Sequence, residues 1–221
     1  MIPNLHKLTQ AGIYFLPLLI GVILHEIAHG WAAERLGDPT ARLAGRISLN
    51  PLVHIDPFGT IFLPLFLFLM NAPFLFGWAK PVPVRQDLLV GGRKGMAKVA
   101  LAGPLTNLML AAASSLIYHG LVWAVHGSII GKGSMWLIEP LILMAGTSVA
   151  INLVLMIVNL VPVPPLDGGR ILVGILPEEM AMAVAKLERY GMFIILLLIV
   201  TNLWSYFITP VLDALLSFFL G

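Results

Sequence analysis

The residues best suited to do chemistry are the consecutive His25-Glu26-Ile27-Ala28-His29, an H-E-x-x-H sequence. On a helix, residues four apart lie on one face, so both imidazoles can bind the same metal ion. The glutamate then lies beside a water molecule that the metal activates, takes its proton and later passes it to the leaving amine. The spacing therefore predicts a metal-dependent hydrolytic site.

The setting of this motif strengthens the prediction. His25, Glu26 and His29 lie in the otherwise apolar stretch Ala11–Ala33. An uncompensated charge in such a helix costs a few kcal/mol or more when the helix is surrounded by lipid. A divalent metal would supply the missing partner, so metal binding is favoured over a pair of histidines that merely pack.

A catalytic metal site needs a third protein ligand. The extended pattern with a third histidine fails, because Ala32 and Arg35 occupy the relevant positions. The residues themselves leave three candidates, His54, Asp56 and Asp167. Prolines and two glycines surround Asp167, which predicts a carboxylate emerging at a broken helix end, where it can reach a metal.

Two distant motifs carry a family resemblance. His25–His29 together with Asn159 and Asp167-Gly168 resembles the site-2 protease family of intramembrane zinc metalloproteases (peptidase family M50). The similarity extends over most of the chain and includes Ala102–Asn107 and Gly77–Val84, in the order that the family shows. The chain resembles a compact member, because it has no room for a PDZ domain.

The resemblance implies a role for each matching residue. His25, His29 and Asp167 would bind one Zn²⁺ per chain, and Glu26 would be the general base. Asn159 would be a further catalytic residue, which helps to hold the scissile peptide or its oxyanion.

Three further residues are candidates for substrate binding. Asn107 matches a recurrent position of the family. Val82 and Val84 lie in a proline-rich stretch suited to an extended strand, whose free edge could pair with an unwound substrate peptide.

Composition places these motifs in a membrane. Of the 221 residues, 59% are hydrophobic and 11% charged, and the mean hydropathy is +0.95. So few charges cannot cover a water-soluble globule, which excludes a soluble enzyme, a nucleic-acid binder and a disordered chain. The absence of cysteine excludes a thiolate metal site. We expect an all-α polytopic membrane protein with a single domain, residues 1–221, comprising a core over 8–176 and a C-terminal helical region over 177–221.

Apolar runs predict about four to five transmembrane helices plus a re-entrant segment. The runs are Ala11–Ala33, Phe58–Ala79, Val99–Val125, Met135–Val161 and Tyr190–Leu220, the last divided by Pro210. Whether the part after Thr209 completes a crossing stays open. Between the last two runs, Pro177–Arg189 alternates apolar and charged positions at helical spacing, which predicts an interfacial helix.

The shared metal restricts the topology. If Phe58–Ala79 crossed the membrane, the paired histidines and Asp167 would lie near opposite faces, about 20 Å or more apart. This run must therefore enter and return, as a short helix followed by a short β-hairpin or strand over Gly77–Val84. Eleven of the thirteen lysines and arginines then share one side. The positive-inside rule makes that side cytoplasmic, so we expect a multi-pass cell-membrane protein whose active site lies toward the cytoplasm.

The resulting hypothesis is an intramembrane zinc metalloprotease, a zinc endopeptidase that cleaves within or next to transmembrane segments in the lipid bilayer. Two alternatives stay open. A metal transporter could use His25, His29 and Asp167 as a transit site, but it has no need of Glu26, so Glu26→Gln separates the two functions. A non-catalytic binder of transmembrane segments would show binding without turnover.

Overall fold

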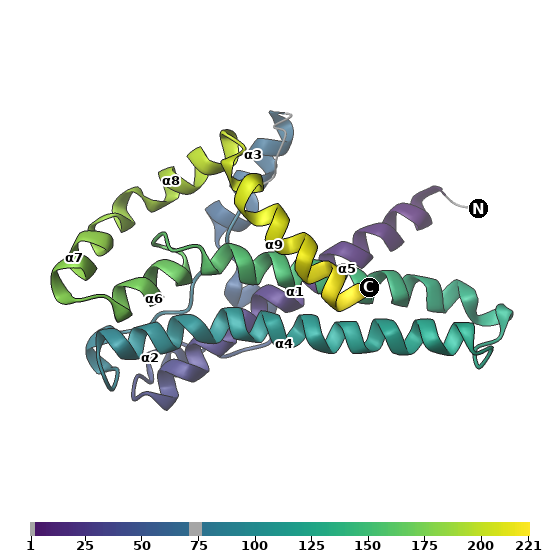
Figure 1. Cartoon of the computed structure of the whole chain (residues 1–221), viewed down its shortest axis with the longest axis horizontal. Coiled ribbons are helices and arrows are strands. Elements are labelled where there is room, and N and C mark those ends of the chain that lie inside the picture. Colours follow the sequence, from purple (N-terminus) through teal and green to yellow (C-terminus); the bar gives the residue numbers. More distant parts are fainter. Residues whose placement is uncertain (1–2, 71–76) are drawn as a thin grey trace.

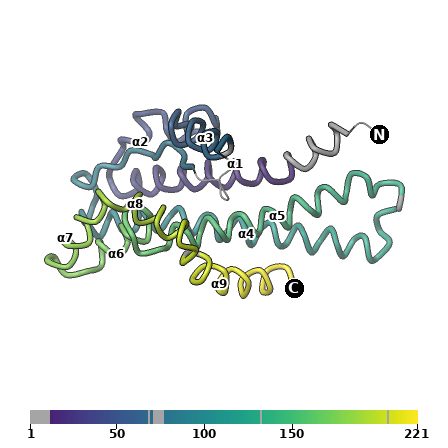
Figure 2. The backbone as a smooth tube through the Cα atoms, turned by 90° about the horizontal axis from the view of Figure 1, so that it is seen from above, coloured from purple at the N-terminus to yellow at the C-terminus, as the bar shows by residue number. Residues whose placement is uncertain are grey.

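Three long helices form the frame of the molecule. The computed structural model describes residues 3–70 and 77–221 (Figure 1). Helices α1 (Pro3–Arg35), α4 (Arg93–His126) and α5 (Met135–Leu160) each contain a stretch long and apolar enough to cross a membrane. Figures 1 and 2 show α4 and α5 side by side as an antiparallel pair, joined at one end through the short helix η4 (Lys132–Ser134).

The pair packs through a small apolar core. Ala111 of α4 and Val149, Leu153 and Met156 of α5 are buried together, and α9 (Leu203–Leu220) packs on the same cluster. A residue as small as alanine at the contact lets the helix backbones approach closely. In lipid, where the hydrophobic effect does not favour helix association, such close packing holds helices together.

The C-terminal run is a bent pair of helices. Helix α8 (Glu188–Val200) and α9 meet at an angle of 77°. Together they form a fourth candidate span only if the bent pair is counted as a single broken span. The described residues thus hold three spans, or four with the bent pair, which reaches the lower end of the predicted four to five and leaves a fifth unconfirmed. The predicted break at Pro210 was misplaced, because α9 continues through Pro210. The chain bends instead at Asn202, whose left-handed backbone (φ 58°) ends the regular helix.

The run between α1 and α4 leaves and returns on itself. It forms the short helices η1 (Pro51–His54), η2 (Pro57–Phe62) and α3 (Leu63–Leu69) before the chain comes back. The Trp78 N–H donates to the Gly59 carbonyl (3.2 Å), and the Thr60 hydroxyl donates to the Trp78 carbonyl (2.8 Å). Residues 71–76, where the predicted reversal falls, lie outside the described residues. The described part of this run holds no helix long enough to span, so α1 and α5 run in the same direction (Figure 1).

The segment 77–85 is extended but is not a strand. The predicted hairpin or strand is absent, since no strand occurs in residues 3–70 or 77–221. Pro81 and Pro83 have no N–H to offer a partner strand. The Lys80 N–H donates to the His54 carbonyl (2.8 Å), and the buried Arg46 donates to the carbonyl of Lys80 (2.6 Å). Loop and side-chain groups thus take the hydrogen bonds that a second strand would make.

Helix α6 (Asp167–Ile175) begins directly after a tight proline turn. The prolines end α5 at Leu160, as the sequence predicts, and the chain folds back closely on itself. A Cβ atom on Gly168 would lie 2.2 Å from the Leu160 carbonyl oxygen, so only glycine fits there. Helix α7 (Glu178–Lys186) follows within the predicted 177–189 stretch. The remaining short elements are α2 (Thr40–Leu43) and η3 (Gln86–Leu88).

A buried aspartate ties the end of α1 to the extended segment. The carboxylate of Asp38, 0% exposed, accepts hydrogen bonds from the Thr40 N–H (2.9 Å), the Thr40 hydroxyl (2.5 Å) and the Arg85 N–H (2.6 Å). Burial opposes its ionisation, but these hydrogen bonds outweigh burial and hold the pKa of Asp38 below its ordinary value of 3.8. The charged form is therefore the one that the fold stabilises.

We expect Asp38→Ala to lower the free energy of unfolding by about 2–4 kcal/mol, because two backbone N–H groups lose their acceptor. A depressed folded-state pKa contributes stability above the unfolded pKa and loses it as pH falls toward the folded pKa. The wild type should therefore lose stability below about pH 4 in a step that the variant lacks. Thermal unfolding in detergent at several pH values measures both effects. Asp87→Ala, which removes an exposed aspartate, should leave the wild-type midpoint unchanged; an equal loss there would contradict the assignment.

Candidate metal centre

Three side chains from two distant segments converge on one point. His25 and His29 come from α1, and Asp167 is the first residue of α6. Their ligand atoms lie within 4.8 Å of one another. The two Nε2 atoms are 3.0 Å apart, and the Asp167 Oδ2 lies 3.1 Å from that of His25 and 3.3 Å from that of His29. The predicted trio is thus brought together at a common depth.

Hydrogen bonds on the far side of each ring orient the imidazoles. His25 Nδ1 lies 2.6 Å from Asn107 Oδ1, and His29 Nδ1 lies 2.8 Å from the Val99 carbonyl oxygen. Because both oxygens accept, each Nδ1 must carry the proton. Each Nε2 is then left with a lone pair, and both lone pairs are available to a metal.

The three converging atoms form a site suited to a cation. His25 is 6% and Asp167 is 5% exposed, and the Asp167 Oδ2 receives no hydrogen bond from any described residue. Three electron-rich acceptors packed this closely and away from water repel one another unless a positive ion lies between them. Two imidazole nitrogens and one carboxylate are a ligand set that catalytic Zn²⁺ uses in proteins.

Glu26 lines the same space without belonging to the trio. A cavity of about 720 Å³ is lined by Glu26, the three candidate ligands and the extended segment. The Val82 N–H donates to Glu26 Oε2 (2.8 Å), which fixes the carboxylate and leaves its other oxygen open to the cavity. This corrects the prediction of a free strand edge at Val82, because its N–H already has a partner within the chain.

Comparison with known proteins agrees with this geometry. The sequence profile of peptidase family M50 matches residues 128–201. YwhC of Bacillus subtilis (strain 168), provisionally named a zinc metalloprotease, is 36% identical over 197 residues, which cover 89% of this chain and 84% of YwhC. The chain belongs to peptidase family M50. Rip2 of Mycolicibacterium smegmatis, also provisionally named a zinc metalloprotease, is 27% identical over 92% of this chain and 74% of its own length. No solved structure matches the chain significantly.

In this M50 chain a glycine makes the close approach of α4 possible. Gly103 lies against both histidine rings, and a Cβ atom there would be 2.5 Å from His25 Cε1 and 2.5 Å from His29 Nε2. Any side chain would enter the space where the candidate ligand atoms meet. The Ala102–Asn107 stretch therefore serves the metal centre, with Gly103 clearing room for the rings.

Asn107 lies behind the metal centre rather than at the cavity wall. The sequence suggests a substrate contact, but Asn107 is 0% exposed and its Oδ1 accepts from His25. Its Nδ2 donates to Asn152 Oδ1 (2.9 Å) and to the Gly21 carbonyl (3.3 Å), which fixes which end of the amide faces His25. The sequence-based prediction missed Asn152, although an amide within a long apolar run needs a hydrogen-bond partner.

Asn159 and Val84 both line the cavity, as their predicted roles require. One N–H of the Asn159 amide donates to the Leu155 carbonyl (2.9 Å), which leaves its second N–H and its Oδ1 for a ligand. Within the described residues, neither side chain makes a hydrogen bond to the candidate ligands. Their substrate-binding roles therefore stay predictions.

His54 and Asp56, the other two candidates for the third ligand, serve the loop before η2. His54 Nε2 donates to the Ser48 carbonyl (2.8 Å), and Asp56 Oδ1 accepts from the N–H groups of Phe58 (3.0 Å) and Gly59 (2.7 Å). Within the described residues, the metal-binding group consists of His25, His29 and Asp167. His54 therefore holds the loop before η1 and Asp56 holds the start of η2, and neither is a ligand.

Proposed function

We propose that this chain is an intramembrane zinc metalloprotease of the site-2 type, which hydrolyses a peptide bond within or beside a transmembrane segment of its substrate. One observation carries the proposal. Two imidazole lone pairs and a buried carboxylate, flanked by Glu26, converge on a cavity between helices apolar enough to cross a membrane. Membership in peptidase family M50 and the names of the relatives support the same reaction.

His25, His29 and Asp167 would hold the zinc ion. When bound, the ion polarises the scissile carbonyl and lowers the pKa of a water molecule to about 7. Glu26 takes the proton from this water and passes it to the leaving amine. The Val82 N–H holds one carboxylate oxygen of Glu26, so the proton is exchanged at the other.

The substrate must be held and locally unwound. A helical backbone keeps its own carbonyls hydrogen-bonded, so the bond to be cut has to leave the helix before Glu26 can act on it. The second amide N–H of Asn159 is available to donate to the oxygen that becomes negative in the transition state. Val84 and its neighbours in the extended segment also line the cavity.

The orientation follows from charge. The C-terminal end of α1, the N-terminal end of α4 and helix α6 lie at the same end of the molecule (Figure 1), and eleven of the thirteen lysines and arginines fall in the segments at that end. Positive residues favour the cytoplasmic face, so the metal centre opens toward the cytoplasm of a multi-pass cell-membrane protein.

Cleavage of a reporter in liposomes tests the proposal. The purified wild type is given a membrane-spanning reporter with a glycine-containing apolar segment and, in parallel, one built only from leucine and alanine. We expect zinc-dependent cleavage inside or beside the first segment, as located by mass spectrometry, and slower cleavage of the second, which unwinds less readily. Chelation should abolish cleavage and added zinc should restore it.

Two results would overturn this function. Zinc-loaded protein that cleaves neither reporter would not be a protease of this type. Cleavage confined to soluble peptides, with the membrane segment untouched, would leave a metallopeptidase but remove the intramembrane substrate.

A further inference from the structure

A second recess adjoins the metal-centre cavity. Its volume is about 480 Å³, and it shares Pro81, Val82, Val84, Met96 and Arg170 with that cavity. The shared wall includes the extended segment, along which an unwound peptide would lie. Given the proposed function, a peptide bound at the metal centre would continue into this recess with the residues next to the cut.

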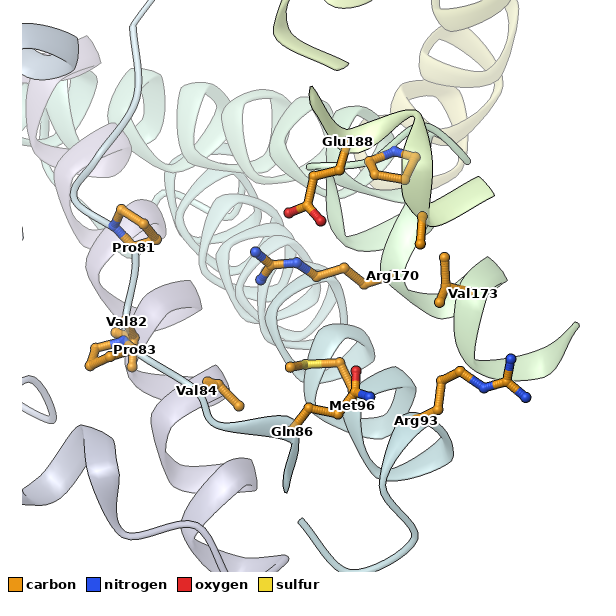
Figure 3. A pocket seen from close by; sticks show the side chains of 12 residues that line it. Pro81, Val82, Pro83, Val84, Gln86, Arg93, Met96, Arg170, Val173 and Glu188 are labelled. Carbon is orange, nitrogen blue, oxygen red and sulfur yellow. The ribbon is translucent and has the colours of Figure 1, made fainter. Parts of the chain in front are cut away.

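Arg170 is the cation that faces both spaces. It lies on α6 three residues after Asp167, so the two side chains share a helix face. Figure 3 shows its guanidinium pointing into the recess. The side chain is half-buried, and the described residues include no hydrogen bond or ion pair to it. A partly desolvated guanidinium without a partner attracts an anion.

The other charges around the recess leave that attraction in place. Arg93 points away from the recess (Figure 3) and pairs with Glu178 at 3.2 Å. Glu188, at the start of α8, points toward Arg170 but is exposed, so water weakens its attraction for the guanidinium without removing it. Most of the remaining wall is apolar and includes Pro81 and Met96, which suits the methylene groups of a side chain.

We propose that this recess is a substrate subsite for an acidic side chain, which Arg170 binds as a guanidinium–carboxylate pair. Such a subsite selects among membrane segments. Residues that flank a transmembrane segment on the cytoplasmic side are commonly lysine or arginine. Arg170 repels those residues, so ordinary segments are disfavoured and segments with an acidic flank are preferred.

A charge scan of the reporter tests the subsite. One position at a time, on the cytoplasmic side of the cleaved bond, is made Glu, Gln or Lys, and kcat/KM is measured in liposomes. At one or two positions the wild type should prefer Glu to Lys by about tenfold, the change that a single favourable charge contact of ordinary strength produces. Arg170→Gln should bring the Glu/Lys ratio to about one, and Arg170→Glu should invert it.

Two further variants sharpen the outcome. Glu188→Gln removes the carboxylate that competes for Arg170 and should raise the Glu/Lys ratio. If the Arg170 variants fail to fold, this variant tests the acidic subsite in their place. Arg189→Gln removes a positive charge from the start of α8, next to Glu188. Arg189 does not line the recess, so this variant should leave the Glu/Lys ratio unchanged.

An unchanged Glu/Lys ratio in Arg170→Glu, or in Glu188→Gln where only that variant folds, would overturn the subsite while cleavage itself upholds the protease. A wild type that cleaves no reporter would overturn the proposed function, and the subsite with it. Zinc content and the unfolding midpoint, measured for every variant, separate loss of fold from loss of selectivity.

Discussion

Replacing Glu26 by glutamine is expected to lower kcat by about 10³-fold, because the amide cannot accept the proton that the carboxylate takes from water. The bound metal should remain, since Glu26 is not one of the three converging ligand residues. Glutamine keeps the shape of the side chain and an oxygen that can accept from the Val82 N–H. The cavity is therefore preserved while its base is removed. Reporter cleavage and zinc content by mass spectrometry, measured on one preparation, provide both readouts.

A matched variant on the same helix serves as the control. Glu34 lies two turns after Glu26, outside the cavity, and pairs with Arg42 near the surface. Glu34→Gln removes the same charge and should leave kcat at the wild-type value. If Glu26→Gln cleaved as fast as the wild type, the carboxylate would not be the base. Ion flux that persisted in that variant without any cleavage would favour a transporter.

Spacing within one helix is the part of the site that the sequence predicts most directly. The separation of His25 and His29 by four residues fixes their shared face, whatever the rest of the chain does. Asp167 was one of three candidates on the residues alone, and the family resemblance selected it. The structure agrees by packing Asp167 against both rings, while His54 and Asp56 are bound into their own loop.

The groups that support the ligands could not be predicted in the same way. The contact between His25 and Asn107 joins residues 82 positions apart and depends on how α1 crosses α4. The bond from Val82 to Glu26 spans 56 positions and depends on an extended segment whose hydrogen bonds go to side chains and loops. No local pattern encodes such contacts, because they arise only when the helices have packed.

The fold shows the same division between local and long-range information. Apolar run length located α4 and α5 closely, since a span of lipid demands a minimum length whatever its neighbours are. The bend at Asn202 was missed because proline is the stronger helix breaker by propensity, yet Pro210 lies within α9. The absent strand at 77–85 has a related cause, because Arg46, distant in sequence, occupies carbonyls that a strand would need.

Replacing Asn107 by leucine should weaken zinc binding by about 10- to 100-fold, the usual loss when a group behind a ligating histidine is removed. Leucine has a similar volume but no acceptor, so the Nδ1 proton of His25 would be left buried without a partner. The ring could then turn or carry its proton on Nε2, and either change withdraws the lone pair from the metal. Competition with a chelator of known affinity measures the loss directly, without reference to cleavage.

Two amides stand in series behind His25, so their contributions to zinc affinity can be measured separately. Asn152→Leu removes the oxygen that fixes the Asn107 amide but leaves Asn107 in place. The zinc affinity of the Asn152→Leu protein should therefore fall by less than that of the Asn107→Leu protein. Thr106→Val is the matched control, because its hydroxyl donates to the Ala102 carbonyl (2.9 Å) on the same helix and away from His25. Wild-type zinc affinity in Asn107→Leu would show that His25 keeps its orientation by packing alone. Equal losses in Thr106→Val and Asn107→Leu would trace the effect to α4 as a whole rather than to the hydrogen bond at 2.6 Å.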